Sequence, residues 1–379
     1  MTRREASIPQ NTPGITAEDR TALTDSLRRL LADRSSESDV RRAMETPSGY
    51  DPALWKELAD MGIAGLIVEE TYGGVGAGPM ELELVTEETG AALLCAPLMS
   101  TVLAAGLLQA LGDEDAKRRL LPEIAKGARI ATVALAGARG GWTREDVAVA
   151  ATRANGGWRL DGTASFVTDG QSADVILVAA RAGDEIGIFG AERGAAGLSV
   201  KPLPTFDHTL RLADLAFAGA PAVRLGGGEA WPAIEQALDL ARVALAGEQA
   251  GGAKRALEIT VDYAKTRAQF GRLIGSFQAI KHMAANLLLE SESAISAARA
   301  AAKALADGAP NVKAQISLAA FACADAYIQV TADAVQMHGG IAFTWAHPAH
   351  LYLRRARADA QLFGAPAHYR ERFLAELGA

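Results

Sequence analysis

A group of side chains in the last third of the chain has the chemistry needed to hold a dinucleotide. Its members are Arg267, Gln269, Phe270, Gln278, Gln336, Gly339 and Gly340. Arg267 offers a planar guanidinium that can bind a diphosphate through two hydrogen bonds, and Phe270 offers a ring for stacking. The glutamine amides can donate and accept hydrogen bonds, and the glycine pair permits close approach of the backbone to a ligand. The pattern therefore predicts a dinucleotide site.

The spacing of these residues resembles the acyl-CoA dehydrogenase family of flavoproteins. The shared features are Tyr-Ala-x-x-Arg-x-Gln-Phe-Gly at residues 263–271, a glutamine eleven residues after Arg267, and Gln-x-x-Gly-Gly at residues 336–340. The resemblance extends over nearly the whole chain. It implies that the seven residues contact FAD held by a neighbouring subunit, and that the chains assemble into homo- or heterotetramers.

Two residues in the middle of the chain are expected to contact the flavin ring. Family members carry a Trp-x-Thr-x-Gly-like segment over the isoalloxazine, and Phe-Val-Thr-Asp-Gly stands at the matching residues 166–170. The resemblance implies that Phe166 stacks on the ring and that Thr168 forms a hydrogen bond near it. In the alternative interpretation, Phe166 is a core residue of a strand and Thr168 is a hydroxyl at a sheet edge.

Two segments depart from the family pattern. Family members usually have a Thr-Glu-Pro-Gly-like loop after the first β strand, whereas residues 134–141 read Ala-Leu-Ala-Gly-Ala-Arg-Gly-Gly. This segment keeps glycines but lacks the hydroxyl and the carboxylate, so we expect a weaker or repositioned flavin contact there. Ala342 stands where the family more often has a third glycine, which adds only one methyl group.

The carboxylate base of acyl-CoA dehydrogenation is absent from its two usual positions. The reaction needs a carboxylate that removes the α proton of a thioester while the β hydride moves to flavin N5. By resemblance, these positions are Phe363 and Ala241. Glu248 lies on the same apolar helix face as Ala241, about 10 Å further along the axis, and is the candidate base because burial would raise its pKa. The alternative is a structural role, in which Glu248 forms a salt bridge with a neighbouring Arg or Lys or is a partly exposed carboxylate that lines the bundle.

The remaining reactive side chains are interpreted as structural. They are His282, His338, His347, His350, Cys95 and Cys323. Pro348 disfavours the helix that would align its two neighbouring histidines, and no third metal-type ligand adjoins them. The cysteines lie in apolar helical surroundings with no CxxC or Cys/His cluster nearby, so the sequence predicts buried thiols and no metal site.

The first third of the chain has the pattern of an α domain. Residues 1–14 are polar and are interpreted as a loose arm. Thr16 with Asp19, and Asp51 with Pro52, are typical of helix starts. Further helices are predicted at residues 79–93, 97–111 and 114–126.

Strand and turn signals follow from Ile130, and a helical period returns after Gly228. The long helical segments are predicted at residues 229–266, 274–307, 311–338 and 349–362. The fold class is therefore α+β, as the family resemblance also implies. Its expected parts are an N-terminal α-helical domain (1–128), a middle antiparallel β domain (129–225) and a C-terminal four-helix bundle (226–379).

The bulk composition is that of a globular protein. The chain has 379 residues, of which 49% are hydrophobic and 22% charged. Its net charge of −7 argues against general binding to nucleic acid or to anionic membranes. No uninterrupted apolar run approaches the roughly 20 residues of a membrane span, and residues 1–6 lack the apolar core of a secretion signal. We therefore expect a cytoplasmic protein.

The predicted function is that of an FAD-dependent acyl-CoA dehydrogenase. Such an enzyme forms an α,β-unsaturated acyl-CoA thioester and passes electrons to an electron-transfer flavoprotein. Residues 246–248 and 340–355 resemble subunits of heterotetrameric actinobacterial-type dehydrogenases, the second segment those acting on steroid side-chain thioesters. The alternative is a catalytically degenerate partner subunit that contributes only to FAD binding or assembly. A flavoprotein oxidase acting on another substrate is a third possibility.

Overall fold

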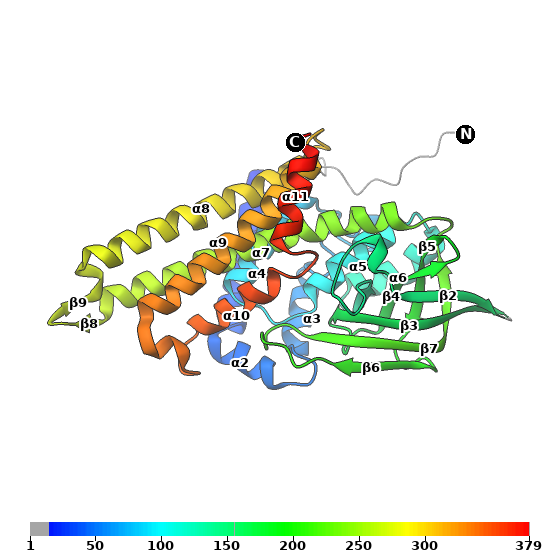
Figure 1. The fold of residues 1–379 in the computed structure, drawn as a ribbon, viewed down its shortest axis with the longest axis horizontal. Helices are drawn as coiled ribbons and strands as arrows, with labels where there is room; N and C mark the ends of the chain where they lie inside the picture. The colour runs from blue at the N-terminus through cyan, green and yellow to red at the C-terminus, as the bar shows by residue number, and fades with distance from the viewer. Residues whose placement is uncertain (1–14, 155, 379) are drawn as a thin grey trace.

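The computed structural model describes residues 15–154 and 156–378, so the arm predicted at residues 1–14 lies outside the described part. The first described part is helical (Figure 1). Its helices are α1 (Ala17–Arg34), α2 (Glu37–Glu45), α3 (Pro52–Asp60), α4 (Pro79–Ala91), α5 (Leu98–Ala110) and α6 (Glu114–Ala125), with a 3-10 turn η1 (Glu70–Tyr72). The sequence pattern does not predict α2, because this short and polar helix buries only Val40 and Ala43.

The predicted helix starts are confirmed. The Thr16 hydroxyl accepts the N–H of Asp19 at 3.1 Å, and the Asp19 carboxylate accepts the N–H of Thr16 at 2.8 Å. The Asp51 carboxylate accepts the N–H of Ala53 at 2.9 Å, and Pro52 occupies the first helical position. These contacts satisfy N–H groups that a helix start leaves unpaired.

Helices α4 and α5 pack on the long helix α7 (Trp231–Thr266), and α5 also contacts the first strand of the sheet. Two glycines bring the α4 and α7 backbones together. A Cβ on Gly90 would lie 2.0 Å from the carbonyl oxygen of Glu248, and one on Gly251 would lie 1.8 Å from that of Glu87. Only glycine permits this approach, which fixes the position of Glu248 relative to α4.

The middle part is a mixed sheet that corrects the prediction of an antiparallel one. Its strands are β1 (Ala131–Ala134), β2 (Val149–Ala154), β3 (Gly157–Thr168), β4 (Val175–Ala182), β5 (Glu185–Glu192), β6 (Leu198–Pro202) and β7 (Leu212–Leu225). The strand order is β1-β4-β2-β3-β7-β5, β5 also pairs with β4, and β6 pairs with β7. Strands β1 and β2 both run parallel to β4. Turn residues predict where a strand ends, but they do not predict its partner or direction.

The last part is a helical bundle whose tip lies at the opposite end of the molecule from the sheet (Figure 1). After α7 come β8 (Ala268–Gln269), β9 (Arg272–Leu273), η3 (Ile274–Ser276), α8 (Gln278–Ala306), α9 (Val312–His338), η4 (Gly339–Phe343), α10 (Ala349–Asp359) and α11 (Pro366–Glu376). The helix predicted at residues 349–362 is shorter than expected. It ends at Asp359, and residues 360–363 form turns. The positive φ values of Phe363 (59°) and Gly364 (127°) prevent a right-handed helix from resuming before Pro366 begins α11.

Within the described residues, one helical span is long and apolar enough to cross a membrane by length and composition alone. It covers Val312–Phe343, with a mean hydropathy of 1.2 and half of its apolar window buried. This span includes α9, which packs against α7, α8, α10 and α11. A buried helix at the centre of a bundle has the same composition.

Candidate functional site

The residues predicted to hold the dinucleotide gather at the bundle tip; we call Arg267, Gln269, Phe270, Gln278, Gln336, Gly339 and Gly340 the tip group. The β8–β9 hairpin, the start of α8 and the end of α9 carry them. The rings of Tyr263 and His338 lie 4.5 Å apart and connect the end of α7 to the end of α9. All seven residues of the tip group are exposed. A Cβ added to Gly339 or Gly340 would meet no atom within 4 Å.

The tip group is open to a ligand or to another chain. Phe270 is 92% exposed and has a positive φ of 52°, an uncommon conformation for a bulky residue. Asp262 lies near the C-terminal end of α7 and pairs with Lys265 at 3.5 Å. Its carboxylate is therefore not the partner of the Arg267 guanidinium. A free guanidinium and an exposed ring suit contact with a diphosphate and a base.

Phe166 and Thr168 lie away from the bundle tip, where β3 ends; we call them the ring pair. The pairing of β3 with β7 is irregular between Ala164 and Val167, and Phe166 has a positive φ of 55°. As a result, the Phe166 side chain is 39% exposed and does not join the strand core. Backbone strain of this kind clusters at ligand sites.

The Thr168 side chain has a buried hydroxyl oxygen with no hydrogen-bond partner among the described residues. Leaving such a group unpaired costs about 1–3 kcal/mol. Its backbone carbonyl is satisfied by the Thr132 hydroxyl at 2.6 Å, so only the side chain awaits a partner. A hydroxyl that needs a partner beside a half-open aromatic ring fits the edge of a flavin at this place.

The divergent loop at residues 134–141 borders the ring pair. The N–H of Ser165 donates to the carbonyl of Ala136 at 2.8 Å, and a Cβ on Gly140 would lie 3.4 Å from the Phe166 ring. A Cβ on Gly141 would overlap the carboxylate of Asp146. The loop is therefore placed to contact a flavin through backbone groups, although it lacks the family's hydroxyl and carboxylate.

One chain does not bring the tip group and the ring pair together. Glu248 and Thr168 line the same cavity, whereas Arg267 lies nineteen residues further along α7. At 1.5 Å per residue, this separation is about 28 Å along the helix axis. The two groups can share one dinucleotide only if each comes from a different chain.

The cavity beside Thr168 has a volume of about 30 Å³. Its polar lining includes Thr168, Asp169, Glu248 and Arg355, and its apolar lining includes Leu94, Leu98 and Met99. The connection between α4 and α5 and the segment before β7 complete the wall.

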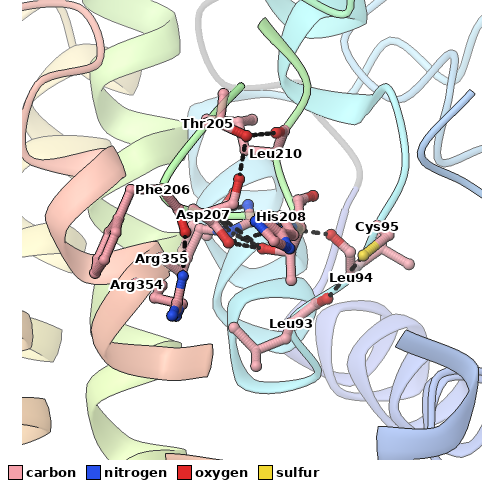
Figure 2. Close-up of polar contacts among 12 residues, drawn as sticks. Leu93, Leu94, Cys95, Thr205, Phe206, Asp207, His208, Leu210, Arg354 and Arg355 are labelled. Carbon is pink, nitrogen blue, oxygen red and sulfur yellow. Dashed lines mark hydrogen bonds and ion pairs between the residues drawn. The ribbon is translucent and has the colours of Figure 1, made fainter. Parts of the chain in front are cut away.

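Glu248 is held by an ion pair inside this wall. Its side chain is 13% exposed, and its carboxylate accepts a hydrogen bond from an Arg355 terminal nitrogen at 2.7 Å. Arg355 also pairs with Asp207 at 3.1 Å and donates to the carbonyl of Leu94 at 3.2 Å (Figure 2). This contact is the salt bridge that formed the alternative interpretation of Glu248.

The charges around Arg355 are unbalanced. Burial raises the pKa of the Glu248 carboxyl, and Arg355 only partly opposes this shift. Asp359, one turn along α10, is buried with both carboxylate oxygens unpaired, and burial raises its pKa well above the ordinary value. Burial lowers the pKa of Arg355, but Glu248 and Asp207 outweigh that effect and keep the guanidinium charged. The cluster therefore holds one cation and a surplus of acids.

Core side chains occupy the two positions at which the sequence resemblance predicts the usual base. Ala241 is fully buried, and Phe363 packs its ring edge-on against Trp142 at 5.1 Å. Both belong to the core that joins α3, α5 and α7. Neither can exchange a proton.

The histidines and cysteines have structural surroundings. His338 contacts the carbonyl of Ala334 at 2.7 Å and His347 at a ring distance of 4.4 Å. Cys95 and Cys323 are buried and unpaired, and burial raises the pKa of both thiols. Among the described residues, no group of three or more His, Cys, Asp or Glu side chains could hold a metal ion.

Asp169 and Arg355 belong to the cavity but are not predicted from the sequence as site residues. Asp169 directly follows the predicted flavin contact Thr168, and this adjacency is the signal that could have identified it. Arg355 is an arginine among several on α10 and gives no such signal, because its partners Glu248 and Asp207 are far away in sequence.

Comparison with known proteins identifies the class. The family model "Acyl-CoA dehydrogenase, N-terminal domain" matches residues 17–128, and "Acyl-CoA dehydrogenase, C-terminal domain" matches residues 228–376. Acyl-CoA dehydrogenase IpdE2 of Mycolicibacterium smegmatis is 34% identical over 363 residues, which cover 95% of this chain and 99% of that relative. The chain belongs to the acyl-CoA dehydrogenase family, whose members are FAD-binding oxidoreductases.

Two solved structures share this fold. A variant of the Tcur3481-Tcur3483 steroid ACAD is 31% identical with a TM-score of 0.85, covering 95% of this chain and 98% of that one. The ChsE4-ChsE5 complex from Mycobacterium tuberculosis is 28% identical with a TM-score of 0.87, covering 96% and 98%. The predicted family and the predicted order of helical, β and helical parts are confirmed.

Proposed function

We propose that this chain binds FAD and dehydrogenates an acyl-CoA to an α,β-unsaturated thioester, with electrons passing to an electron-transfer flavoprotein. The observation that carries the proposal is the buried, unpaired hydroxyl of Thr168 beside a cavity that holds two carboxylates. When bound, FAD supplies the acceptor for the β hydride. The chain's own residues hold the thioester, exclude water from it and accept its α proton.

The proposed flavin site is shared between two chains. The ring pair of one chain borders the flavin ring, and the tip group of another chain holds the adenosine diphosphate half. The support for this division is the length of α7, because Thr168 lines a cavity with Glu248 at the middle of α7, whereas Arg267 lies at the C-terminal end of this helix. An exposed Phe270 and an uncovered glycine pair suit contact with a second chain.

The proposed substrate is a thioester with a bulky acyl group, processed in a heteromeric assembly. The support is the similarity to a steroid ACAD and to a complex of two different chains. Glu248 stays a predicted base, although its ion pair with Arg355 favours a structural role. A cytoplasmic location also stays a prediction.

A second candidate function is a partner subunit without chemistry of its own. The observation that favours it is the burial of Phe363 and Ala241 in the core at both usual base positions. In that case FAD would be held with the help of the tip group while the reaction occurs in a site that another chain completes.

Anaerobic titration separates the two functions. The protein is purified alone and with its co-expressed partner, and acyl-CoA thioesters of increasing size are added while flavin absorbance is followed. We expect a yellow protein whose flavin is bleached by at least one thioester. A colourless protein that stays colourless with added FAD, and whose partner is fully active alone, would favour the second function.

A further inference from the structure

We propose that Asp169 is the base that removes the α proton of the bound thioester. This inference rests on the proposed function, because it assigns the step for which both usual positions lack a carboxylate. The assignment rests on the position of Asp169 in the cavity wall next to Thr168, and on the absence of a cationic side chain at hydrogen-bond distance from it among the described residues.

Asp169 enters the cavity from the turn that ends β3. Its carboxylate accepts a hydrogen bond from the Ser100 hydroxyl at 2.7 Å, and the residue is only 8% exposed. Its N–H donates to the carbonyl of Arg211 at 2.8 Å, which fixes the backbone. The carboxylate therefore has a defined position facing the start of α5.

The backbone conformation of Asp169 restricts which residues can occupy the position. Its φ is 54°, in the left-handed region that aspartate and asparagine tolerate better than other non-glycine residues. Phe166, three residues earlier, has a φ of 55°. Two strained residues flanking Thr168 mark a segment shaped for a ligand rather than for strand pairing.

The cavity wall suits a thioester chain near its carbonyl group. Leu98 and Met99 form an apolar side, and Thr168 and Asp169 form a polar side. The volume of about 30 Å³ admits a water or a small group, so a longer acyl chain requires side chains to move. Met99 has an unbranched side chain that can adopt other rotamers to admit such a chain.

The other buried acids around Arg355 are less suited to the role, and Asp207 pairs with Arg355 at 3.1 Å. Glu248 accepts a hydrogen bond from Arg355 at 2.7 Å, so protonating it would break a buried ion pair. Asp359 does not line the cavity, and both of its buried carboxylate oxygens lack a hydrogen-bond partner among the described residues. Burial raises its pKa well above the ordinary value, which favours the protonated form over the carboxylate that a base requires. Asp169 is held by a hydroxyl and can be protonated without the loss of an ion pair.

Two C–H bonds of the thioester break in the proposed step. The Cα–H bond breaks and its proton moves to an Asp169 oxygen, while the electron pair of that bond forms the Cα–Cβ double bond. The Cβ–H bond breaks and its hydride leaves to FAD, the oxidant of the proposed function. Reoxidation by an electron-transfer flavoprotein lets Asp169 return its proton to solvent.

The surroundings of Asp169 suit a base at neutral pH. Burial raises the pKa of its carboxyl to about 6, and Ser100, Arg355 and Arg211 limit the rise. The other titratable groups lining the same cavity are Tyr50 and Glu248. Near pH 7 most of the carboxylate is ionised, yet its pKa is close enough to that pH for efficient proton transfer.

The test compares Asp169→Asn with Asp161→Asn in the FAD-loaded protein. Asparagine tolerates the left-handed backbone and can accept the Ser100 hydrogen bond, so the fold should persist. Asp161 lies exposed on β3, the strand that precedes Asp169, and provides the control. Flavin reduction is measured anaerobically with butanoyl-CoA, octanoyl-CoA, palmitoyl-CoA and a steroid side-chain thioester.

We expect Asp169→Asn to slow reduction at least about 100-fold, the lower end of the range for a general base. Its FAD content, melting temperature and affinity for crotonyl-CoA, measured calorimetrically, should match those of the parent. Carboxyl ¹³C NMR of the labelled protein should show one resonance titrating near pH 6 that Asp169→Asn removes. The control variant should leave every one of these quantities unchanged.

Two results would overturn the assignment alone. One is a parent protein that is reduced while Asp169→Asn is reduced equally fast. The other is a loss of reduction in Glu248→Gln with none in Asp169→Asn. A parent protein that binds FAD but is reduced by no thioester, with or without its partner, would instead contradict the proposed function and remove the basis of the assignment.

Discussion

Replacing Arg355 by methionine should destabilise the protein by about 3–5 kcal/mol, the usual cost of removing one partner from a buried ion pair. Arg355 is 7% exposed at its side chain and is the cation that Glu248 and Asp207 both contact. Methionine fills much of the space but leaves both acids, together with Asp359, in a wall of low polarity. The assay is urea unfolding at pH 8 and at fixed protein concentration, because assembly also contributes to stability.

Arg357 supplies the matched control, since it lies on the same helix with an exposed side chain. Arg357→Met should cost less than about 0.5 kcal/mol. The cost of Arg355→Met should shrink at pH 5. An acid whose pKa is raised in the folded state stabilises the fold when it is protonated. This contribution to the free energy of unfolding is lost as the pH rises through the folded-state pKa. A cost below about 1 kcal/mol for Arg355→Met, or equal costs for both variants, would refute the proposed role of the ion pair.

Three further predictions concern stability, measured by denaturant unfolding. Tyr72→Phe removes a 2.6 Å hydrogen bond to Glu114 and should cost about 1 kcal/mol at pH 8. Because this bond raises the Tyr72 pKa to about 12, the difference should fade above pH 10; a constant difference would contradict this. Gly251→Ala should cost at least about 1–3 kcal/mol, whereas Gly227→Ala, in open space, should be nearly neutral. Burial raises the Glu83 pKa to about 7, so parent stability should decline between pH 4.5 and 7, and Glu83→Gln should abolish that decline. A pH profile of stability that is the same in Glu83→Gln as in the parent would contradict this role of Glu83.

Much of the fold follows from local patterns in the sequence. The capping of α1 by Thr16 and the start of α3 at Asp51 are local events, and the structure shows both. Strand direction is not local, so the parallel pairing of β1 with β4 was not predicted. The turn after α10 includes Phe363 in a left-handed conformation, of which an apolar side chain gives no sign in the sequence.

The candidate site, like the fold, has features that follow from local sequence and features that depend on packing. Helix geometry separates Arg267 from Glu248 by about five turns of α7, but only the structure places Thr168 beside Glu248. From the sequence, the contribution of a second chain is implied by the family resemblance. The partner of Glu248 cannot be derived in this way, because Arg355 is 107 positions away and meets it only through packing of α10 on α7. The same holds for Asp169 and Ser100, which lie 69 positions apart.

The central claim, a flavin held jointly by two chains, is tested most directly by FAD content in mixed oligomers. Thr168→Val and Arg267→Ala are each expected to lose most of their FAD, measured by absorbance per chain. Oligomers that contain both variants, isolated through two different tags, restore one intact site for each variant pair. We predict that they recover about half of the parent FAD content. Mixed oligomers as poor in FAD as either variant alone would contradict a shared site.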